Sequence, residues 1–275
     1  MRTRRFGPLG VELPVIGLGT WNLERDDRAQ AIAALRRGIE LGMGHIDTAE
    51  MYGDGAAEEI VGEAIAGQRD RVFLVSKVLP QNAEAAATRR ACEASLRRLG
   101  TDRLDLYLLH WRGDTPLAET IDAFEALREA GKIRAWGVSN FDDADLDEVE
   151  QLAPGAVACN QVLYHLGERT IEHGVIPWCE RRGVAVVAYS PFGSRGGFPQ
   201  SAVLAALAAR LGATPRQLAL AYLTRRPAVF AIPKAASVAH VDELAGAGRV
   251  TLDDASIAEI EAAFPLAPWR GLPMI

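Results

Sequence analysis

The chain has 275 residues, which is long enough for two domains and equally ordinary for a single α/β barrel. Hydrophobic residues make up 49% of the sequence and charged residues 24%, a balance typical of a globular protein with a substantial core. The formal net charge is −6 and the arginines are interspersed with acidic residues, which argues against nucleic acids and anionic membranes as partners. We therefore expect a small-molecule partner.

The N-terminal segment and the cysteines indicate the cytoplasm. Residues 1–5 are basic, but Pro8 and Pro14 interrupt the segment after them, so the apolar stretch of a signal peptide is missing. No apolar stretch reaches membrane-spanning length. The three cysteines form no Cys-x-x-Cys pair, as expected of buried thiols in a reducing compartment: Cys92, Cys159 and Cys179. We expect a cytoplasmic protein that works as a monomer.

The predicted elements alternate along the chain. Residues 5–13 predict a short hairpin that turns through residues 7–10. Apolar and β-branched runs then predict strands at 15–18, 45–47, 72–77, 104–110, 133–139, 157–161, 185–190 and 229–232. Amphipathic stretches between them predict helices at 28–41, 83–99, 115–130 and 171–182. Two further helices are expected at 214–224, with Thr214 as N-cap and Pro215 in the first turn, and at 252–264.

This order predicts the fold. Eight β/α alternations in about 230 residues favour a closed (β/α)₈ barrel over an open doubly wound sheet. The N-terminal hairpin, the last helix and a Pro-rich tail are additions to it. We expect residues 1–275 to form one such barrel domain.

Lysine is rare in this chain. Three lysines stand against 27 arginines, so a lysine should mark a position that arginine does not fill: Lys77, Lys132 and Lys234. Lys77 ends the third predicted strand, Asp47 ends the second and His110 ends the fourth. Barrel enzymes carry their chemistry at the C-terminal ends of the strands. The sequence therefore predicts a catalytic site there.

A tyrosine on the loop after the second strand joins this set. The phenol of Tyr52 can act as an acid, but a free tyrosine has a pKa near about 10. An adjacent ammonium, from Lys77, is expected to lower that pKa by stabilising the phenolate. Asp47 would pair with Lys77 and hold it protonated, and neutral His110 would position a substrate carbonyl oxygen.

In order, spacing and strand context, these four residues resemble the catalytic tetrad of the aldo-keto reductase superfamily. Further motifs follow in family order at residues 17–21 (GLGTW), 137–141 (GVSNF), 188–191 (AYSP) and 232–234 (IPK). Residues 109–113 (LHWRG) are similar to bacterial members, a group that includes reductases of small aldehydes such as methylglyoxal. The resemblance implies NAD(P)H-dependent reduction of aldehydes, ketones or dicarbonyls to alcohols, with Tyr52 as the proton donor.

The resemblance also implies the residues that bind the cofactor. They are Ser139, Asn140 and Gln161 for the nicotinamide carboxamide, Tyr189 for its ring, Ser190, Phe192, Gly193 and Ser194 for the pyrophosphate, and Lys234 and His240 for the 2′-phosphate. The chain departs from many members at Ala235, His240 and Leu244, where serine, arginine and asparagine are common. Since histidine is a weaker phosphate ligand than arginine, NADPH is the expected cofactor and NADH remains possible.

Other readings of these residues stay open. Taken singly, each tetrad member has an ordinary structural role, for example as a turn cap, a surface ring, an ion pair or a core histidine. Trp21, Trp111 and Trp269 are candidates for the substrate pocket, and each can equally be a packing residue. The remaining histidines show no metal-ligand spacing, so no metal is expected.

Two other functions compete with carbonyl reduction. A Schiff-base aldolase also uses a lysine at a barrel strand end, but pairing with Asp47 would make Lys77 a poor nucleophile. A redox-sensing regulatory subunit would bind the cofactor with little turnover. The short connection 111–114 after His110 predicts an open pocket and a broad range of carbonyl substrates.

Overall fold

Eight parallel strands pair in chain order in the computed structural model, which describes residues 1–193, 198, 199 and 201–275. They are β3 (Leu18–Gly19), β4 (His45–Asp47), β5 (Phe73–Val78), β6 (Leu104–Leu109), β7 (Ile133–Ser139), β8 (Cys159–Leu163), β9 (Ala185–Tyr189) and β10 (Val229–Ala231). Parallel bridges from Ile16 to Ala231 and from Gly19 to Lys234 join the first strand to the last. The predicted (β/α)₈ barrel is confirmed.

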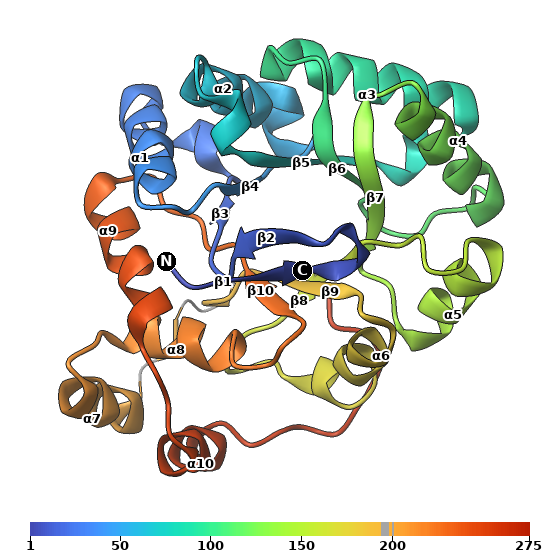
Figure 1. The fold of residues 1–275 in the computed structure, drawn as a ribbon. Helices are drawn as coiled ribbons and strands as arrows, with labels where there is room; N and C mark the ends of the chain where they lie inside the picture. Colours follow the sequence, from blue (N-terminus) through green and yellow to red (C-terminus); the bar gives the residue numbers. More distant parts are fainter. Residues whose placement is uncertain (194–197, 200) are drawn as a thin grey trace.

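Helices surround this ring of strands, as Figure 1 shows. They are α1 (Arg28–Glu40), α2 (Ala56–Ile65), α3 (Ala85–Leu99), α4 (Leu117–Glu129), α5 (Asp143–Leu152), α6 (Val175–Arg182), α7 (Ala202–Leu211), α8 (Pro215–Leu223), α9 (Val238–Gly246) and α10 (Asp254–Ala263). Thr214 caps α8 as predicted, because its side chain accepts a hydrogen bond from the Gln217 amide. The strand interiors and the inner helix faces form one continuous apolar core.

Four of these helices were not among those predicted from the sequence: α2, α5, α7 and α9. The acidic helix α5 shows why, since Leu146 and Val149 are its buried residues and leave little apolar periodicity to detect. The first strand is also shorter than predicted. Val15 and Ile16 lie beside the last strand in an isolated bridge, where the Ala231 N–H donates a hydrogen bond to the Val15 carbonyl oxygen at 2.9 Å.

Two glycines of the GLGTW segment allow the first strand to approach its neighbours. A Cβ on Gly17 would lie 2.4 Å from the carbonyl oxygen of His45, and one on Gly19 would lie 2.5 Å from that of Ile232. Both contacts are with backbone, which cannot move aside cheaply. Glycine is therefore required where the barrel closes.

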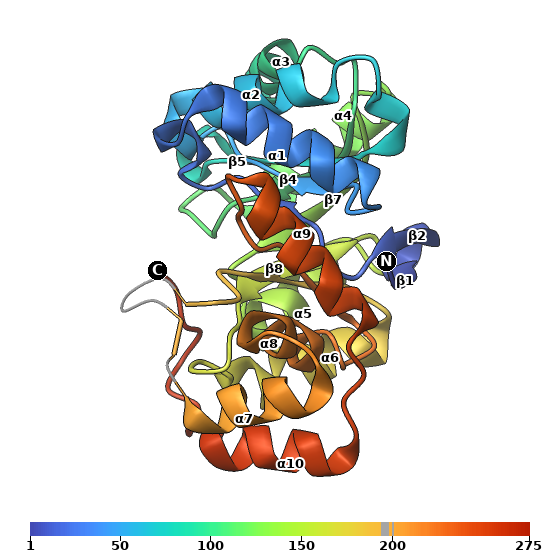
Figure 2. The same ribbon diagram turned by 90° about the vertical axis from the view of Figure 1, so that its left-hand side faces the viewer.

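A hairpin of β1 (Thr3–Phe6) and β2 (Val11–Pro14) lies across the end of the barrel where the strands begin (Figure 1). In Figure 2 the hairpin and the chain's C-terminus lie at opposite ends of the barrel. Phe6 is fully buried and contacts the rings of His45, Phe73 and Phe230 at 5.7, 5.4 and 5.0 Å between centroids. The hairpin thus closes one end and leaves the other for the site.

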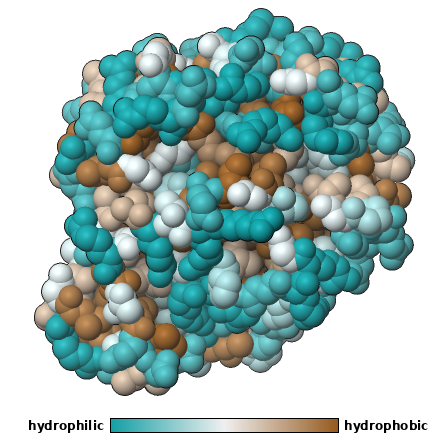
Figure 3. Space-filling model, in the orientation of Figure 1, coloured by the Kyte–Doolittle hydropathy of each residue, from teal (hydrophilic) through white to brown (hydrophobic). Residues whose placement is uncertain are grey.

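The face that carries the hairpin is mostly hydrophilic, with apolar residues in small groups (Figure 3). One such group lies over α7, where Val203 and Leu211 are exposed. In the described ranges, every helix is too short or too polar to cross a membrane.

His45 is a buried titratable group beneath the site. Its ring packs edge-on against Phe6 and Phe73, and neither ring nitrogen has a hydrogen-bond partner among the described residues. Burial, assisted by the positive charge of Lys77, lowers the pKa of His45 to about 4. The fold therefore requires the neutral imidazole.

We predict that His45 makes the protein less stable in mild acid. A folded pKa of about 4 lies below the unfolded value of about 6.5, so below pH 6.5 the unfolded chain binds more protons. The stability is complete above about pH 6.5 and is lost as the pH falls toward 4. From pH 7 to pH 5 the loss should be about 2 kcal/mol.

Urea unfolding of the wild type and of His45→Leu at both pH values measures this loss. The packing cost of the substitution is the same at both pH values and cancels. The variant should lose about 2 kcal/mol less than the wild type between pH 7 and pH 5. Parallel losses in the two proteins would show that His45 does not titrate in this way.

Candidate active site

The four predicted catalytic side chains converge at the C-terminal ends of β4, β5 and β6. Asp47 ends β4, Lys77 lies near the end of β5 and His110 follows β6, while Tyr52 begins a short 3₁₀ turn after β4. The Lys77 Nζ lies 2.5 Å from Asp47 Oδ1 and 3.1 Å from the Tyr52 hydroxyl. The rings of Tyr52 and His110 meet edge to face, with 5.8 Å between centroids.

Lys77 is the centre of this group. Its side chain is 0% exposed, and its ammonium donates three hydrogen bonds, to Asp47, to the Thr48 carbonyl oxygen at 2.8 Å and to Tyr52. The second carboxylate oxygen of Asp47 accepts a hydrogen bond of 2.7 Å from Gln161 Nε2. All three protons of the ammonium are therefore used, which fixes both its charge and its position.

Burial and pairing act against each other in this ion pair. Burial alone would lower the pKa of Lys77, but the charges and hydrogen bonds of Asp47 and Tyr52 raise it above its ordinary value. Burial raises the pKa of Asp47, which the ammonium of Lys77 partly offsets. The lysine is thus protonated at neutral pH and positively charged beside the phenol.

The expectation for Tyr52 was wrong in direction. Burial raises the pKa of the Tyr52 phenol, and the charge of Lys77 offsets only part of that rise. The sequence showed the neighbouring cation but could not show that solvent is excluded around the hydroxyl. The phenol is therefore protonated at neutral pH, as a proton donor must be.

His110 is neutral throughout the physiological range. Burial, with a smaller contribution from the charge of Lys77, lowers the pKa of His110 to about 2. Its Nδ1 has no hydrogen-bond partner among the described residues, while its ring contacts Tyr52 and Trp111. A neutral imidazole beside the phenol can donate one hydrogen bond to a carbonyl oxygen.

A second layer holds the turn that carries Tyr52. A Cβ on Gly55 would lie 2.4 Å from the side chain of Arg98, which covers the turn. Arg98 donates to Glu58 at 2.6 Å, and the same buried carboxylate accepts from Ser76, the neighbour of Lys77, at 2.5 Å. Arg98 and Glu58 thus connect the turn that carries Tyr52 to the strand that carries Lys77, and no sequence motif indicated these two residues.

These groups face a cavity of about 160 Å³. Its wall consists of Gly19, Thr20, Trp21, Asp47, Met51, Tyr52, His110, Trp111, Ser139, Asn140, Gln161, Tyr189, Ser190, Ile232, Lys234, Met274 and Ile275. Two of the three predicted pocket tryptophans, Trp21 and Trp111, line it. Trp269 is absent from the wall and 38% exposed, and the tail instead contributes Met274 and Ile275.

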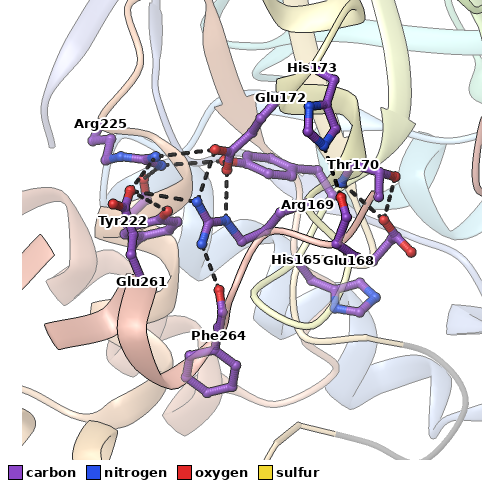
Figure 4. A network of polar contacts seen from close by, with 12 residues as sticks. His165, Glu168, Arg169, Thr170, Glu172, His173, Tyr222, Arg225, Glu261 and Phe264 are labelled. Atoms are coloured by element: carbon purple, nitrogen blue, oxygen red, sulfur yellow. Dashed lines mark hydrogen bonds and ion pairs between the residues drawn. The ribbon is translucent and has the colours of Figure 1, made fainter. Parts of the chain in front are cut away.

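A network of polar contacts anchors the beginning of that tail (Figure 4). Arg169 is 5% exposed, pairs with Glu172 at 2.9 Å and donates to the carbonyl oxygen of Phe264, after α10, at 2.7 Å. His173 Nε2 lies 2.8 Å from the carbonyl oxygen of Ala267. Contacts with Arg169 and His173, in the segment after β8, thus hold residues 264–267, from which the tail continues to the cavity.

One wall of the cavity carries neutral hydrogen-bonding groups. Ser139 donates to the Gln161 carbonyl oxygen at 2.9 Å, and the Asn140 amide donates to the His110 carbonyl oxygen at 3.1 Å. The hydroxyl of Tyr189 donates to Asn140 Oδ1 at 2.8 Å, which orients its half-buried ring at the cavity wall. Amide and hydroxyl groups beside a flat ring are suited to a nicotinamide, so these residues fit the cofactor that the resemblance implied.

Strained backbone positions lie at or near the rim of the cavity. In the described part of the chain four non-glycine residues have a positive φ, between 45° and 60°: Asn22, Asp54, Asn140 and Ser190. Asn140 and Ser190 line the cavity, Asn22 follows Trp21 and Asp54 follows Tyr52 by two positions. Such conformations cost on the order of 1–3 kcal/mol each and cluster at functional sites.

The remaining predicted cofactor residues lie farther from the catalytic group. Lys234 lines the cavity, but its ammonium forms an ion pair with Asp26, a partner the sequence did not suggest. Phe192, Gly193 and His240 lie outside the cavity wall, with His240 in the first turn of α9. Ser194 lies outside the described residues. In the described ranges, no group of three or more histidine, cysteine or acidic side chains is placed to hold a metal ion.

Comparison with known proteins relates this geometry to a family. The model of the Aldo/keto reductase family matches residues 15–264. The methylglyoxal reductase YeaE of Escherichia coli is 50% identical over 263 residues, which cover 93% of this chain and 92% of that protein.

Two solved structures are similar along nearly the whole chain. Both are aldo-keto reductases from Klebsiella pneumoniae at 49% identity. The complex with NADP and acetate has a TM-score of 0.95 and covers 99% of each chain. The complex with NADPH has a TM-score of 0.94 and covers 100% of this chain and 99% of the other.

The ion pair at the centre of the site generates a prediction about stability. Lys77→Met leaves the Asp47 carboxylate buried without its counter-charge, which should lower the free energy of unfolding by about 3–5 kcal/mol. The double variant with Asp47→Asn buries no charge at either position, so it should be at least about 1 kcal/mol more stable than Lys77→Met alone.

Guanidinium unfolding of the wild type, both single variants and the double variant measures this double-mutant cycle. A double variant whose loss equals the sum of the two single losses would contradict a coupled ion pair.

Proposed function

The chain belongs to the aldo/keto reductase family and is an NADPH-dependent carbonyl reductase, and on this premise we propose which residues carry the reaction and which carbonyls it takes. Tyr52 is the proton donor, His110 binds the carbonyl oxygen, and the pair Asp47–Lys77 holds the phenol in place. The observation that carries the assignment is the 3.1 Å contact between the Tyr52 hydroxyl and the buried ammonium of Lys77.

NADPH, when bound, supplies a hydride to the carbonyl carbon, and the overall reaction converts a carbonyl, NADPH and one proton into an alcohol and NADP⁺. Electron density then grows on the carbonyl oxygen, and this chain must provide the proton. Tyr52 is placed and protonated to give it. The positive charge of Lys77 stabilises the phenolate that remains, and neutral His110 donates a hydrogen bond without competing as an acid.

The cofactor's carboxamide is assigned to Ser139, Asn140 and Gln161, and its ring to Tyr189. Their mutual hydrogen bonds support this assignment, because they fix these groups before any ligand binds. Ser190, Phe192, Gly193 and Ser194 are proposed for the pyrophosphate, and Lys234 and His240 for the 2′-phosphate. NADH is a weaker alternative cofactor.

We propose small aldehydes and dicarbonyls of the methylglyoxal type as substrates. The size of the cavity, about 160 Å³, and its wall of Trp21, Trp111 and Met51 beside Tyr52 support this class. The name of the Escherichia coli relative, which matches over almost the whole chain, points the same way. Trp269 stays a candidate only for larger substrates, since it lies outside the cavity wall.

The site does not favour an aldolase. Lys77 is fully buried, absent from the cavity wall and protonated, so it cannot attack a carbonyl. A regulatory subunit with little turnover is not favoured either, because the relatives that match most of the chain are reductases.

We further infer that the chain is a single barrel domain that acts as a cytoplasmic monomer. The three cysteines are free and buried, which suits a reducing compartment, and one chain supplies every side chain of the catalytic group. Size-exclusion chromatography with light scattering tests the oligomeric state, and a stable dimer would overturn it.

Tyr52→Phe tests the proposed mechanism. The variant keeps the ring and removes the proton donor, so turnover with methylglyoxal should fall by about 10²- to 10⁴-fold. The dissociation constant for NADPH, measured by fluorescence titration, should change by less than about twofold, because the phenol is not assigned to cofactor binding.

Tyr107→Phe is the matched control. It deletes the hydroxyl of another buried tyrosine, which has no hydrogen-bond partner among the described residues and lies outside the cavity wall. Its turnover should equal that of the wild type. A Tyr52→Phe variant that retained most of its activity would show that another group protonates the substrate.

A further inference from the structure

An arginine that the resemblance did not assign lies beside the predicted cofactor segment. Arg216 is the second residue of α8, and its side chain is 49% exposed. Its guanidinium carbon lies 5.9 Å from the ring centroid of Phe192 and 5.7 Å from that of Phe198. The two rings meet edge to face at 5.6 Å. We call these three side chains the aromatic–guanidinium cluster.

The cluster bridges two elements on which the proposed function places the cofactor. Phe192 follows Ser190, which lines the cavity, by two residues. On the other side, Arg216 Nη1 approaches Glu243 Oε2 of α9 to 4.0 Å, one helical turn after His240. Gln217, the next residue, donates to the Glu243 carbonyl oxygen at 2.7 Å and holds α8 against α9. Arg216 therefore lies between the pyrophosphate segment and the helix proposed for the 2′-phosphate.

The 2′-phosphate end of NADPH is negatively charged, and a side chain that is always positive would bind it best. The 2′-phosphate carries up to two negative charges, and Lys234, its first assigned ligand, is paired with Asp26. His240, its second assigned ligand, offers no planar pair of donors. A guanidinium is always charged, stacks on rings and presents parallel N–H groups to a phosphate.

We propose that Arg216 binds the adenosine 2′-phosphate end of NADPH. This inference rests on the proposed function. The ring centroids of Phe192 and Phe198 lie 5.9 and 5.7 Å from the guanidinium carbon, and the distant approach to Glu243 is a weak contact that a phosphate can replace. Arg216 thus supplies the planar guanidinium that Lys234 and His240 do not offer.

Binding of 2′,5′-ADP, which contains only this end of the cofactor, tests the proposal without turnover. Calorimetric titration should give a dissociation constant about 5- to 20-fold higher for Arg216→Gln than for the wild type, as expected for one half-exposed charged contact. Arg216→Lys should bind with an intermediate constant, because it keeps the charge and loses the plane. The constant for NADPH should rise in parallel.

Arg210→Gln is the matched control. Arg210 lies on α7 with 53% of its side chain exposed and pairs with Glu259 of α10, so the substitution removes the same charge from an equally exposed arginine. It should bind 2′,5′-ADP as the wild type does. Lys234→Ala serves as the positive comparison, with weaker binding expected.

The outcomes separate this inference from the proposed function. If Arg216→Gln binds 2′,5′-ADP as tightly as the wild type and Arg210→Gln do, Arg216 is not a ligand. That result would leave the proposed function standing, provided that the wild type reduces methylglyoxal. A wild type that neither binds NADPH nor reduces methylglyoxal would instead overturn the proposed function. Thermal unfolding of each variant shows whether a change in binding reflects loss of the fold.

Discussion

The site depends on one interaction, the buried ion pair between Asp47 and Lys77. Removing both charges from water is costly, and the structure compensates with three hydrogen bonds that the ammonium donates and a further one from Gln161 to the carboxylate. Asp47, Thr48 and Tyr52 come from β4 and the loop after it, Lys77 comes from β5 and Gln161 comes from β8. The pair therefore has its full set of partners only when β4 and β5 are in register and β8 faces them across the barrel, which couples the chemistry to closure of the barrel.

The same exclusion of solvent sets the protonation states that the reaction needs. Burial raises the pKa of Tyr52 and lowers the pKa of His110, so the donor keeps its proton and the imidazole stays neutral. Lys77 is the charged member of the three because Asp47 stabilises its ammonium. Two neutral groups at the cavity wall, with a cation behind the phenol, form an arrangement suited to protonating an oxygen that becomes negative.

The rim above this centre is more exposed than the catalytic group. The rim contains four residues with positive φ in the described part of the chain, an exposed tail and a surface ion pair between Lys234 and Asp26. The network around Arg169 restrains the tail at Phe264 and Ala267 (Figure 4), yet Met274 and Ile275 at the cavity remain about half exposed. A buried catalytic group thus lies beneath a partly exposed rim.

The sequence by itself determined the barrel, the family and the four converging side chains, because strand periodicity and the parallel alternation of strands and helices place every strand's C-terminal end on one face. It also indicated Trp21 and Trp111, which lie next to recognisable strand ends. Only the tertiary structure decided the pKa of Tyr52, the partner of Lys234 and the presence of Met274 and Ile275 at the cavity in place of Trp269. It also placed Arg216 against Phe192. Each of these depends on solvent exclusion or on contact between segments far apart in the chain, and local residue patterns carry neither.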